Sequence, residues 1–106
     1  MTISTEHIRD MSQLFKAMSD PSRLRIIESL LDGELNVRQI TERVGMSQSA
    51  VSHQLGMLRA LHLARATRDG RQMYYALDDQ HVVDLFQRSL AHIRHASGES
   101  KPTSQE

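Results

Sequence analysis

The sequence predicts one mostly helical α+β domain with a single β-hairpin, in the order α-α-α-α-β-β-α. Three observations lead to this fold class. Apolar residues recur every three or four positions over residues 6–61, the period changes to two from residue 63, and a helical period returns after residue 79. A length of 106 residues also suits one domain. We therefore expect one domain at residues 1–97, followed by a disordered polar tail at residues 98–106.

The first two helices are predicted from apolar spacing and from the residues at their ends. Residues 6–18 place four apolar side chains on one stripe: Ile8, Met11, Phe15 and Met18. In the next helix Asp20 is a suitable N-cap, and Pro21 suits the first helical position because proline lacks the amide hydrogen that this position leaves unpaired. The second apolar stripe starts at Leu24, and Gly33 ends the helix.

The next two helices are joined by a very short connection. Asn36 can cap a short helix together with Gln39 three residues later, and Gly45 suits the end of that helix. Ser47 can then cap the following helix. The apolar side of this helix is formed by Val51, Leu55, Leu58 and Leu61. Its other side is polar, so residues 36–61 are predicted to form a helix, a tight turn and a second helix.

A β-hairpin and a final helix complete the predicted fold. Residues 63–77 alternate between two faces around a turn at Asp69-Gly70, which is typical of a hairpin. Asp78-Asp79 then offers an N-cap for a helix with the apolar residues Val82, Val83, Phe86, Leu90 and Ile93. A helix-turn-helix followed by a hairpin is the winged helix-turn-helix arrangement.

The polar side of the helix after Ser47 and the arginines of the hairpin are candidate DNA contacts. Hydrogen-bonding side chains on that helix can approach base edges in the major groove, and the candidates are Gln48, Ser49, Ser52 and His53. Hairpin arginines can contact phosphates or the minor groove, and the candidates are Arg65, Arg68 and Arg71. Either set alone is equally typical of ordinary protein surface. The joint occurrence of helix, turn, helix and basic hairpin favours DNA binding.

The formal net charge is zero, but the charges are unevenly placed. Residues 38–71 contain six Arg against two acidic residues, which gives this stretch a net charge of +4 and the rest of the chain −4. Arg makes up 11 of the 13 basic residues, and its planar guanidinium suits phosphate contacts. The local charge therefore indicates a polyanionic partner.

The composition excludes several classes of protein. The chain has no Cys, which rules out a disulfide framework and any thiolate metal site. Its apolar runs are far shorter than the roughly 18 residues that a membrane span needs, and no cleavable leader pattern is present. We expect a soluble, cytoplasmic protein with no membrane partner and no organic cofactor. Aromatic residues are scarce, so burial in a monomer would be marginal and a subunit interface would add to it.

Three short motifs resemble the ArsR/SmtB family of repressors. They are Asp20-Pro21-Ser22-Arg23, the run from Met46 to Leu55 (MSQSAVSHQL), and Asp69-Gly70-Arg71 with Tyr74-Tyr75. The resemblance covers about residues 6–95, and the run from Met46 is its most specific part. It implies a homodimeric winged-helix repressor that binds operator DNA when metal-free and is released when a metal ion binds.

Four possible metal ligands lie at the two ends of the last predicted helix: Asp79, His81, His92 and His95. The eleven residues from His81 to His92 correspond to a rise of about 16 Å, which is too long for one zinc ion to bridge. They also make about three full turns, so the three His share one side of the helix. If the helix pairs antiparallel with its symmetry mate, a two-fold dimer has two sites, each with ligands from both chains.

This ligand pattern resembles the site on the last helix of the zinc- and cobalt-sensing, CzrA-like branch of the family. One carboxylate and three imidazoles suit tetrahedral Zn(II), and Co(II) next. Other members carry a Cys-rich site written Glu-Leu-Cys-Val-Cys, whereas residues 34–38 here read Glu-Leu-Asn-Val-Arg. Sensing of arsenic, lead or cadmium through that site is therefore not expected. Nickel sensors of the family use more ligands, for which His7 is a candidate.

The expected function is a metal-responsive repressor, with a metal efflux gene as the target that the resemblance implies. Metal binding between subunits would favour an arrangement in which the two reading helices, one after Ser47 in each subunit, are less well spaced for binding DNA. A ligand His donates its second ring N–H to another group, and we expect His92 or His95 to reach the backbone near Leu61-His62.

Two other functions compete with this one. A zinc hydrolase would use Asp79 or Glu99 as a base, but four protein ligands leave no open coordination position, so the chain is not expected to be an enzyme. The closer alternative is a winged-helix repressor that responds to another signal and holds a purely structural metal ion. A metal-storage role does not explain the DNA-reading elements.

Overall fold

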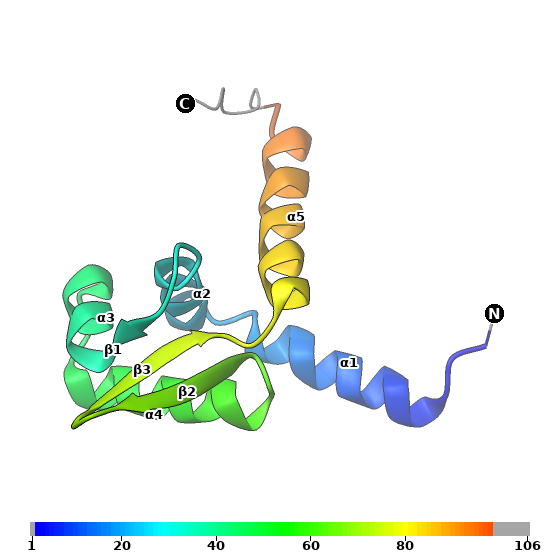
Figure 1. Ribbon diagram of the computed structural model, residues 1–106. Helices are drawn as coiled ribbons and strands as arrows, with labels where there is room; N and C mark the ends of the chain where they lie inside the picture. Colours follow the sequence, from blue (N-terminus) through cyan, green and yellow to red (C-terminus); the bar gives the residue numbers. More distant parts are fainter. Residues whose placement is uncertain (1, 99–106) are drawn as a thin grey trace.

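The computed structural model describes residues 2–98, with a compact body from which two helices project (Figure 1). The elements in chain order are α1 (Thr5–Ala17), α2 (Pro21–Ser29), β1 (Leu35–Asn36), α3 (Val37–Val44), α4 (Gln48–Ala60), β2 (Ala64–Asp69), β3 (Gln72–Leu77) and α5 (Gln80–Ala96). The body contains α2, α3, α4 and the sheet, whereas α1 and α5 leave it in different directions. The predicted helices and the hairpin are thus confirmed.

Most predicted helix ends are formed by the residues expected. Asn36 and Gln39 form a reciprocal capping box at the start of α3, with both bonds 2.9 Å long. Gly45 ends α3 in the left-handed conformation with φ 72°. Ser47 accepts the amide of Ala50 at the start of α4. The turn between α3 and α4 is therefore fixed by local hydrogen bonds.

The two ends of α2 differ from the prediction. This helix ends at Ser29 with Leu30 as its C-cap, before the Gly33 that was expected to end it. The cap at its start differs in its bonding. Asp20 occupies the N-cap position of α2 and Pro21 follows it, but the Asp20 side chain makes no cap hydrogen bond. Its carboxylate instead accepts the hydroxyl of Ser22 at 2.7 Å and lies 3.7 Å from the guanidinium of Arg23. This carboxylate is occupied by side chains on the first turn of α2.

The predicted hairpin is part of a three-stranded antiparallel sheet with the order β1-β3-β2. The two residues of β1 pair with Tyr74 and Tyr75 of β3, and sequence reasoning missed this strand. The hairpin turn also falls one residue later than predicted, because Asp69 pairs with Gln72 and leaves Gly70 and Arg71 between the strands. Residues 73–76 of β3 are all partly buried rather than alternately exposed.

The core lies between α2, α3, α4 and the sheet. Its fully buried large side chains are Ile26, Ile27, Ile40, Val51, Leu55 and Leu58. Leu77 at the end of β3 and Val82 at the start of α5 are also buried, and they join the last helix to this core. Aliphatic side chains thus supply the core, as the scarcity of aromatic residues requires.

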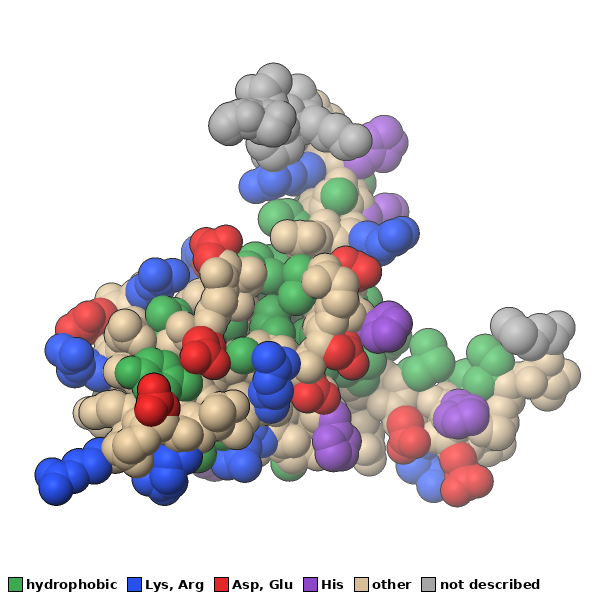
Figure 2. All heavy atoms as spheres, viewed as in Figure 1, with side chains coloured by type: hydrophobic (Ala, Val, Ile, Leu, Met, Phe, Trp, Pro, Cys, Tyr) green, Lys and Arg blue, Asp and Glu red, His purple; other side chains and the backbone are tan. Residues whose placement is uncertain are grey.

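The projecting helices keep apolar faces that nothing in the described chain covers. On α1 the side chains of Ile8, Met11 and Phe15 are 52%, 43% and 52% exposed. On α5, Ile93 is 61% exposed. Figure 2 shows hydrophobic side chains along α1 and around the base of α5. Exposure of this extent along two helices marks an unpaired apolar surface.

Candidate DNA-binding surface and metal ligands

The exposed side of α4 carries the polar residues predicted to read DNA. Val51, Leu55 and Leu58 point into the core, and this fixes which side of α4 faces outward. The four predicted base contacts all lie on that outward side and are exposed: Gln48, Ser49, Ser52 and His53. The small size of the two serines leaves the helix backbone accessible to a base edge.

The tip of the hairpin carries two of the three predicted arginines. Arg68 lies in β2 and Arg71 lies in the turn, and both side chains are exposed. Gly70 has φ 65°, a conformation that glycine adopts without steric cost, and this closes the turn tightly. Basic side chains gather around this tip and beside α4 (Figure 2). Both elements therefore present positive charge and hydrogen-bond donors.

Arg65 has a different environment from the other two arginines. Its Nη1 donates to the backbone carbonyls of Leu77 at 2.7 Å and of Asp78 at 2.8 Å. These bonds tie β2 to the connection that leads into α5. Arg65 thus links the hairpin to the segment that precedes the last helix. The alternation of residues in the sequence could not show these partners.

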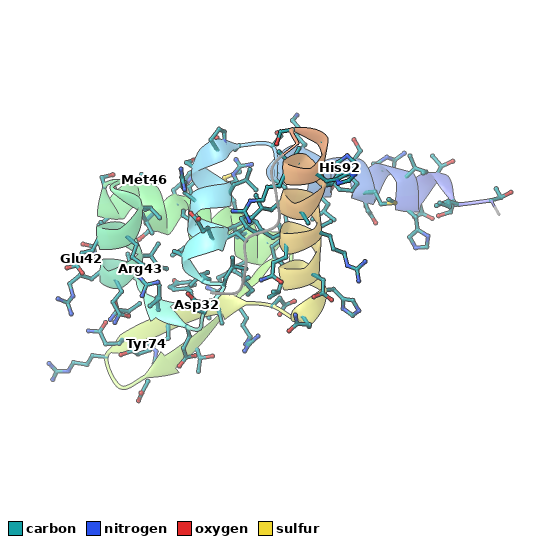
Figure 3. The ribbon with its side chains drawn as sticks, turned by 90° about the horizontal axis from the view of Figure 1, so that it is seen from above. Asp32, Glu42, Arg43, Met46, Tyr74 and His92 are labelled. Carbon is teal, nitrogen blue, oxygen red and sulfur yellow. The ribbon has the colours of Figure 1, made fainter. Side chains whose placement is uncertain are left out.

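The predicted metal ligands lie at opposite ends of α5. Asp79 is the N-cap residue, and its Oδ1 accepts the amide of Val82 at 3.2 Å. The same oxygen lies 3.5 Å from Nδ1 of His81, so these two side chains are neighbours. His92 and His95 lie on the last turns of α5 and are exposed, and Figure 3 shows His92 far along that helix.

These four side chains form two separate pairs within one chain. Among residues 2–98, no group of three or more His, Cys, Asp or Glu side chains is close enough to hold one metal ion. The apolar residues Val82 and Ile93 each follow a His by one position, so they lie on another side of α5 from the three His. Figure 2 shows His side chains along one edge of this helix.

The donor set itself fits a metal ion. Both interactions of Asp79 use Oδ1, which leaves Oδ2 for another partner. His81, His92 and His95 are exposed, and neutral imidazole nitrogen is a common ligand of zinc. The residues present therefore suit a borderline divalent cation better than a soft one, because the chain has no thiolate to offer.

Sequence reasoning did not find the position of Arg23. This residue, noted only as part of a short motif, is largely buried and donates a 2.7 Å hydrogen bond from Nε to the side chain of Gln54 on α4. A partner 31 positions away in the sequence cannot be inferred from local spacing.

No helix within the described residues is long and apolar enough to cross a membrane.

A reading helix after a tight turn, followed by a basic hairpin, defines the chain as a winged helix-turn-helix DNA-binding domain. Residues 20–66 match the family described as bacterial regulatory protein, arsR family. The chain is 39% identical over 92 residues to the transcriptional repressor SmtB homolog of Synechocystis sp., covering 87% of this chain and 70% of that protein. The chain therefore belongs to the ArsR family of transcriptional regulators and is not an enzyme.

Two solved structures show the same fold. A homodimeric winged helix-turn-helix DNA-binding domain from Mycobacterium bovis has a TM-score of 0.81 and 26% identity, and the match covers 91% of this chain and 90% of that one. The antimony-specific transcriptional repressor AntR has a TM-score of 0.82 and 30% identity, with 93% and 90% covered. The winged helix-turn-helix fold predicted from the sequence is confirmed.

Proposed function

We propose that this protein is a metal-responsive transcriptional repressor. It binds operator DNA as a metal-free homodimer and is released when Zn(II) or Co(II) binds at two sites between the subunits. One domain at residues 1–97 performs both tasks. The observation that carries the proposal is the placement of two exposed ligand pairs at opposite ends of α5.

The uncovered apolar surface supports a homodimer. An apolar groove of about 340 Å³ lies between α1, α2 and α5, and Phe15, Leu24, Phe86 and Ile93 are among the residues that line it. The exposed faces of α1 and α5 flank this groove, so one two-fold interface can cover all of them. The M. bovis domain of the same fold is homodimeric. Burial of this surface would add the apolar area that the small core lacks.

A dimer built on α5 would also complete the metal sites. If two copies of α5 lie antiparallel, Asp79 and His81 of one subunit approach His92 and His95 of the other. Each site then has one carboxylate and three imidazole ligands, which is a tetrahedral set for Zn(II) or Co(II). Two-fold symmetry gives two such sites. AntR is named for antimony, whereas the donors here are nitrogen and oxygen only, and we propose a different ion for this chain.

The DNA contacts divide into two classes. Gln48, Ser49, Ser52 and His53 on α4 would contact base edges in the major groove. Arg68 and Arg71 at the hairpin tip would contact phosphates or the minor groove, and Arg65 would support the hairpin that presents them while adding positive charge. The two α4 helices of the dimer would read two half-sites about one helical turn apart.

Release by metal is a thermodynamic linkage between metal binding and DNA binding. A metal ion that bridges the subunits favours the subunit arrangement in which its ligands meet, and it weakens DNA binding if that arrangement separates the reading helices unsuitably. Within the part of the chain that the structure describes, the side chains of His92 and His95 have no hydrogen-bond partner. A relay from these His to the backbone near Leu61-His62 would therefore involve the partner subunit. A repressor relieved by a metal ion suits control of a gene for efflux of that ion.

Mixed dimers test the shared site most sharply. One variant combines Asp79→Ala with His81→Ala, and the other combines His92→Ala with His95→Ala. Each homodimer lacks half of every proposed site, but a mixed dimer has one site with all four ligands. We expect an equimolar mixture of the two variants to restore tight zinc binding at one ion per mixed dimer, measured by calorimetry.

The contrary results are also clear. If mixing restores no zinc binding, the sites are not shared between subunits in this way. If the sites are shared but zinc leaves the affinity of the wild-type dimer for DNA unchanged, the metal is structural and the repressor responds to another signal.

A further inference from the structure

Arg23 connects three parts of the molecule that are distant in the sequence. Its Nε donates to Oε1 of Gln54 at 2.7 Å, and its Nη1 donates to the backbone carbonyl of Ala17 at 3.2 Å. Its Nη2 lies 3.4 Å from the sulfur of Met57. Ala17 ends α1, whereas Gln54 and Met57 belong to α4. The Arg23 side chain is only 17% exposed, so water competes little for these bonds.

The Gln54 side chain is held from both of its ends. Its oxygen accepts from Arg23, while its Nε2 lies 3.5 Å from Oδ2 of Asp20 and 3.4 Å from the hydroxyl of Ser22. The Ser22 hydroxyl also donates to the same Asp20 oxygen at 2.7 Å. The first turn of α2 is thus bonded to the middle of α4. We call the set Asp20, Ser22, Arg23 and Gln54 the α2–α4 network.

The direction in which α1 leaves the body depends on a small area of contact. Ala17 is the one buried residue of α1, and Leu14 and Met18 pack partly against the core at the same end. The rest of the helix projects away from the body (Figure 1). The bond from Arg23 to the last carbonyl of α1 is therefore placed where a small change of angle moves the whole helix.

We propose that Arg23 is a positioning residue that sets the angle between α1 and the reading helix α4. The inference rests on the proposed function, in which α1 lies in the dimer interface and α4 lies on DNA. The two α4 helices of the dimer must enter half-sites that lie about 34–36 Å apart. An error in this angle therefore moves these helices out of register with the grooves. The same error leaves contacts within one half-site intact.

The shape of the arginine side chain explains why this residue suits the position. A guanidinium presents its N–H groups in a fixed planar fork, so its three nitrogens can address three fixed partners at once. Lysine retains the positive charge but concentrates its donors on one nitrogen at the end of a flexible chain. Arg23→Lys therefore separates the role of geometry from the role of charge.

DNA binding by matched variants tests this role. The variants are Arg23→Lys and Gln54→Met, which removes the polar end of Gln54 while keeping its length. The control is Arg25→Lys, because Arg25 lies on the same helix but is 71% exposed and pairs only with Glu28 among the described residues. The probe is a two-half-site duplex selected from a random pool with the parent protein, compared with the same duplex after one half-site is scrambled.

We expect both network variants to bind the two-half-site duplex about tenfold more weakly, within the roughly 5-fold to 150-fold range of coupling between distant parts of a protein. Affinity for the scrambled duplex should change less than threefold, and the control should behave as the parent does. Equal weakening on both duplexes, or no weakening on the first, would overturn the proposal.

A distance measurement supplies a second, independent readout. Since the chain has no Cys, Ala60→Cys gives one spin label near the end of each α4 without interference. The distance between the labels of a dimer should have one narrow distribution in the parent and a broad or shifted one in Arg23→Lys. An unchanged distribution overturns the positioning role, whereas a parent with no measurable distance overturns the dimer, and with it the proposed function.

Discussion

Replacement of Ile93 by Ser should weaken the proposed dimer without weakening the fold of one subunit. Ile93 lies on the apolar face of α5 and lines the groove between α1 and α5, yet 61% of it is exposed in one chain. Burying that fraction should contribute about 1–2 kcal/mol, because full burial of an isoleucine contributes roughly 1.5–3 kcal/mol. Ile and Ser have similar helix propensities, so the substitution changes mainly this burial.

The two-fold symmetry of the interface doubles the effect. Each dimer buries Ile93 twice, so Ile93→Ser should cost about 2–4 kcal/mol of association free energy. This corresponds to a dimer dissociation constant about 30-fold to 700-fold higher, since a factor of ten is about 1.4 kcal/mol. Sedimentation equilibrium over a dilution series measures this constant directly.

A matched control separates the interface from the helix itself. Gln87→Ser changes an exposed residue on another side of α5 and should leave the dissociation constant within about twofold, as expected for surface positions. If Ile93→Ser changes the constant less than threefold, the apolar face of α5 does not form the dimer. If both variants weaken the dimer equally, the effect comes from the helix and not from burial.

Three further predictions follow from single residues. His62 follows α4 with φ 59°, a conformation that costs a non-glycine residue roughly 1–2 kcal/mol. His62→Gly should therefore raise the free energy of unfolding, measured by urea titration, by about 0.5–1 kcal/mol. A decrease would contradict the backbone strain at this position. The hydroxyl of Ser22 and the charge of Arg23 hold the pKa of Asp20 below its ordinary 3.8. The wild type should therefore be more stable than Asp20→Asn above about pH 4, and this difference should disappear as the pH falls through the lowered pKa. A difference independent of pH would contradict this. Arg71→Ala should make the slope of log affinity against log salt shallower by about 0.9 for each phosphate that Arg71 neutralises, and an unchanged slope would show that Arg71 does not bind phosphate.

The helices could be predicted because their ends are encoded locally. Asn36 and Gln39 lie three residues apart and satisfy each other's backbone partners, and the Ser47 side chain caps the start of α4. Gly45 supplies the one left-handed residue that a tight turn between these helices needs. None of these features depends on a distant part of the chain.

Features that depend on distant partners could not be predicted in the same way. Strand β1 has only two residues and exists because β3 lies beside it, so no alternation could reveal it. The roles of Arg65 and Arg23 are set by carbonyls and side chains of other elements. Their sequence neighbours gave no reason to separate these two arginines from those that bond to no other element.

The candidate site lies between these two cases. The helical period correctly places Gln48, Ser52 and His53 on the exposed side of α4. The same period puts the three His of α5 on one side, but it cannot show what faces them, because in the proposed dimer the other half of each metal site belongs to a second chain. Candidate ligands can thus be chosen from the sequence, whereas the geometry of the proposed site depends on the dimer.

The central claim is that metal binding between the subunits controls DNA binding by the dimer, and a single titration tests it most directly. The affinity of the wild-type protein for its selected two-half-site duplex is measured by fluorescence anisotropy with zinc absent and with zinc saturating. We expect zinc to weaken binding by about 5-fold to 150-fold, the usual range of coupling between two sites, and to have no such effect on His92→Ala. Equal affinity with and without zinc in the wild type, or the same weakening in His92→Ala, would contradict the account.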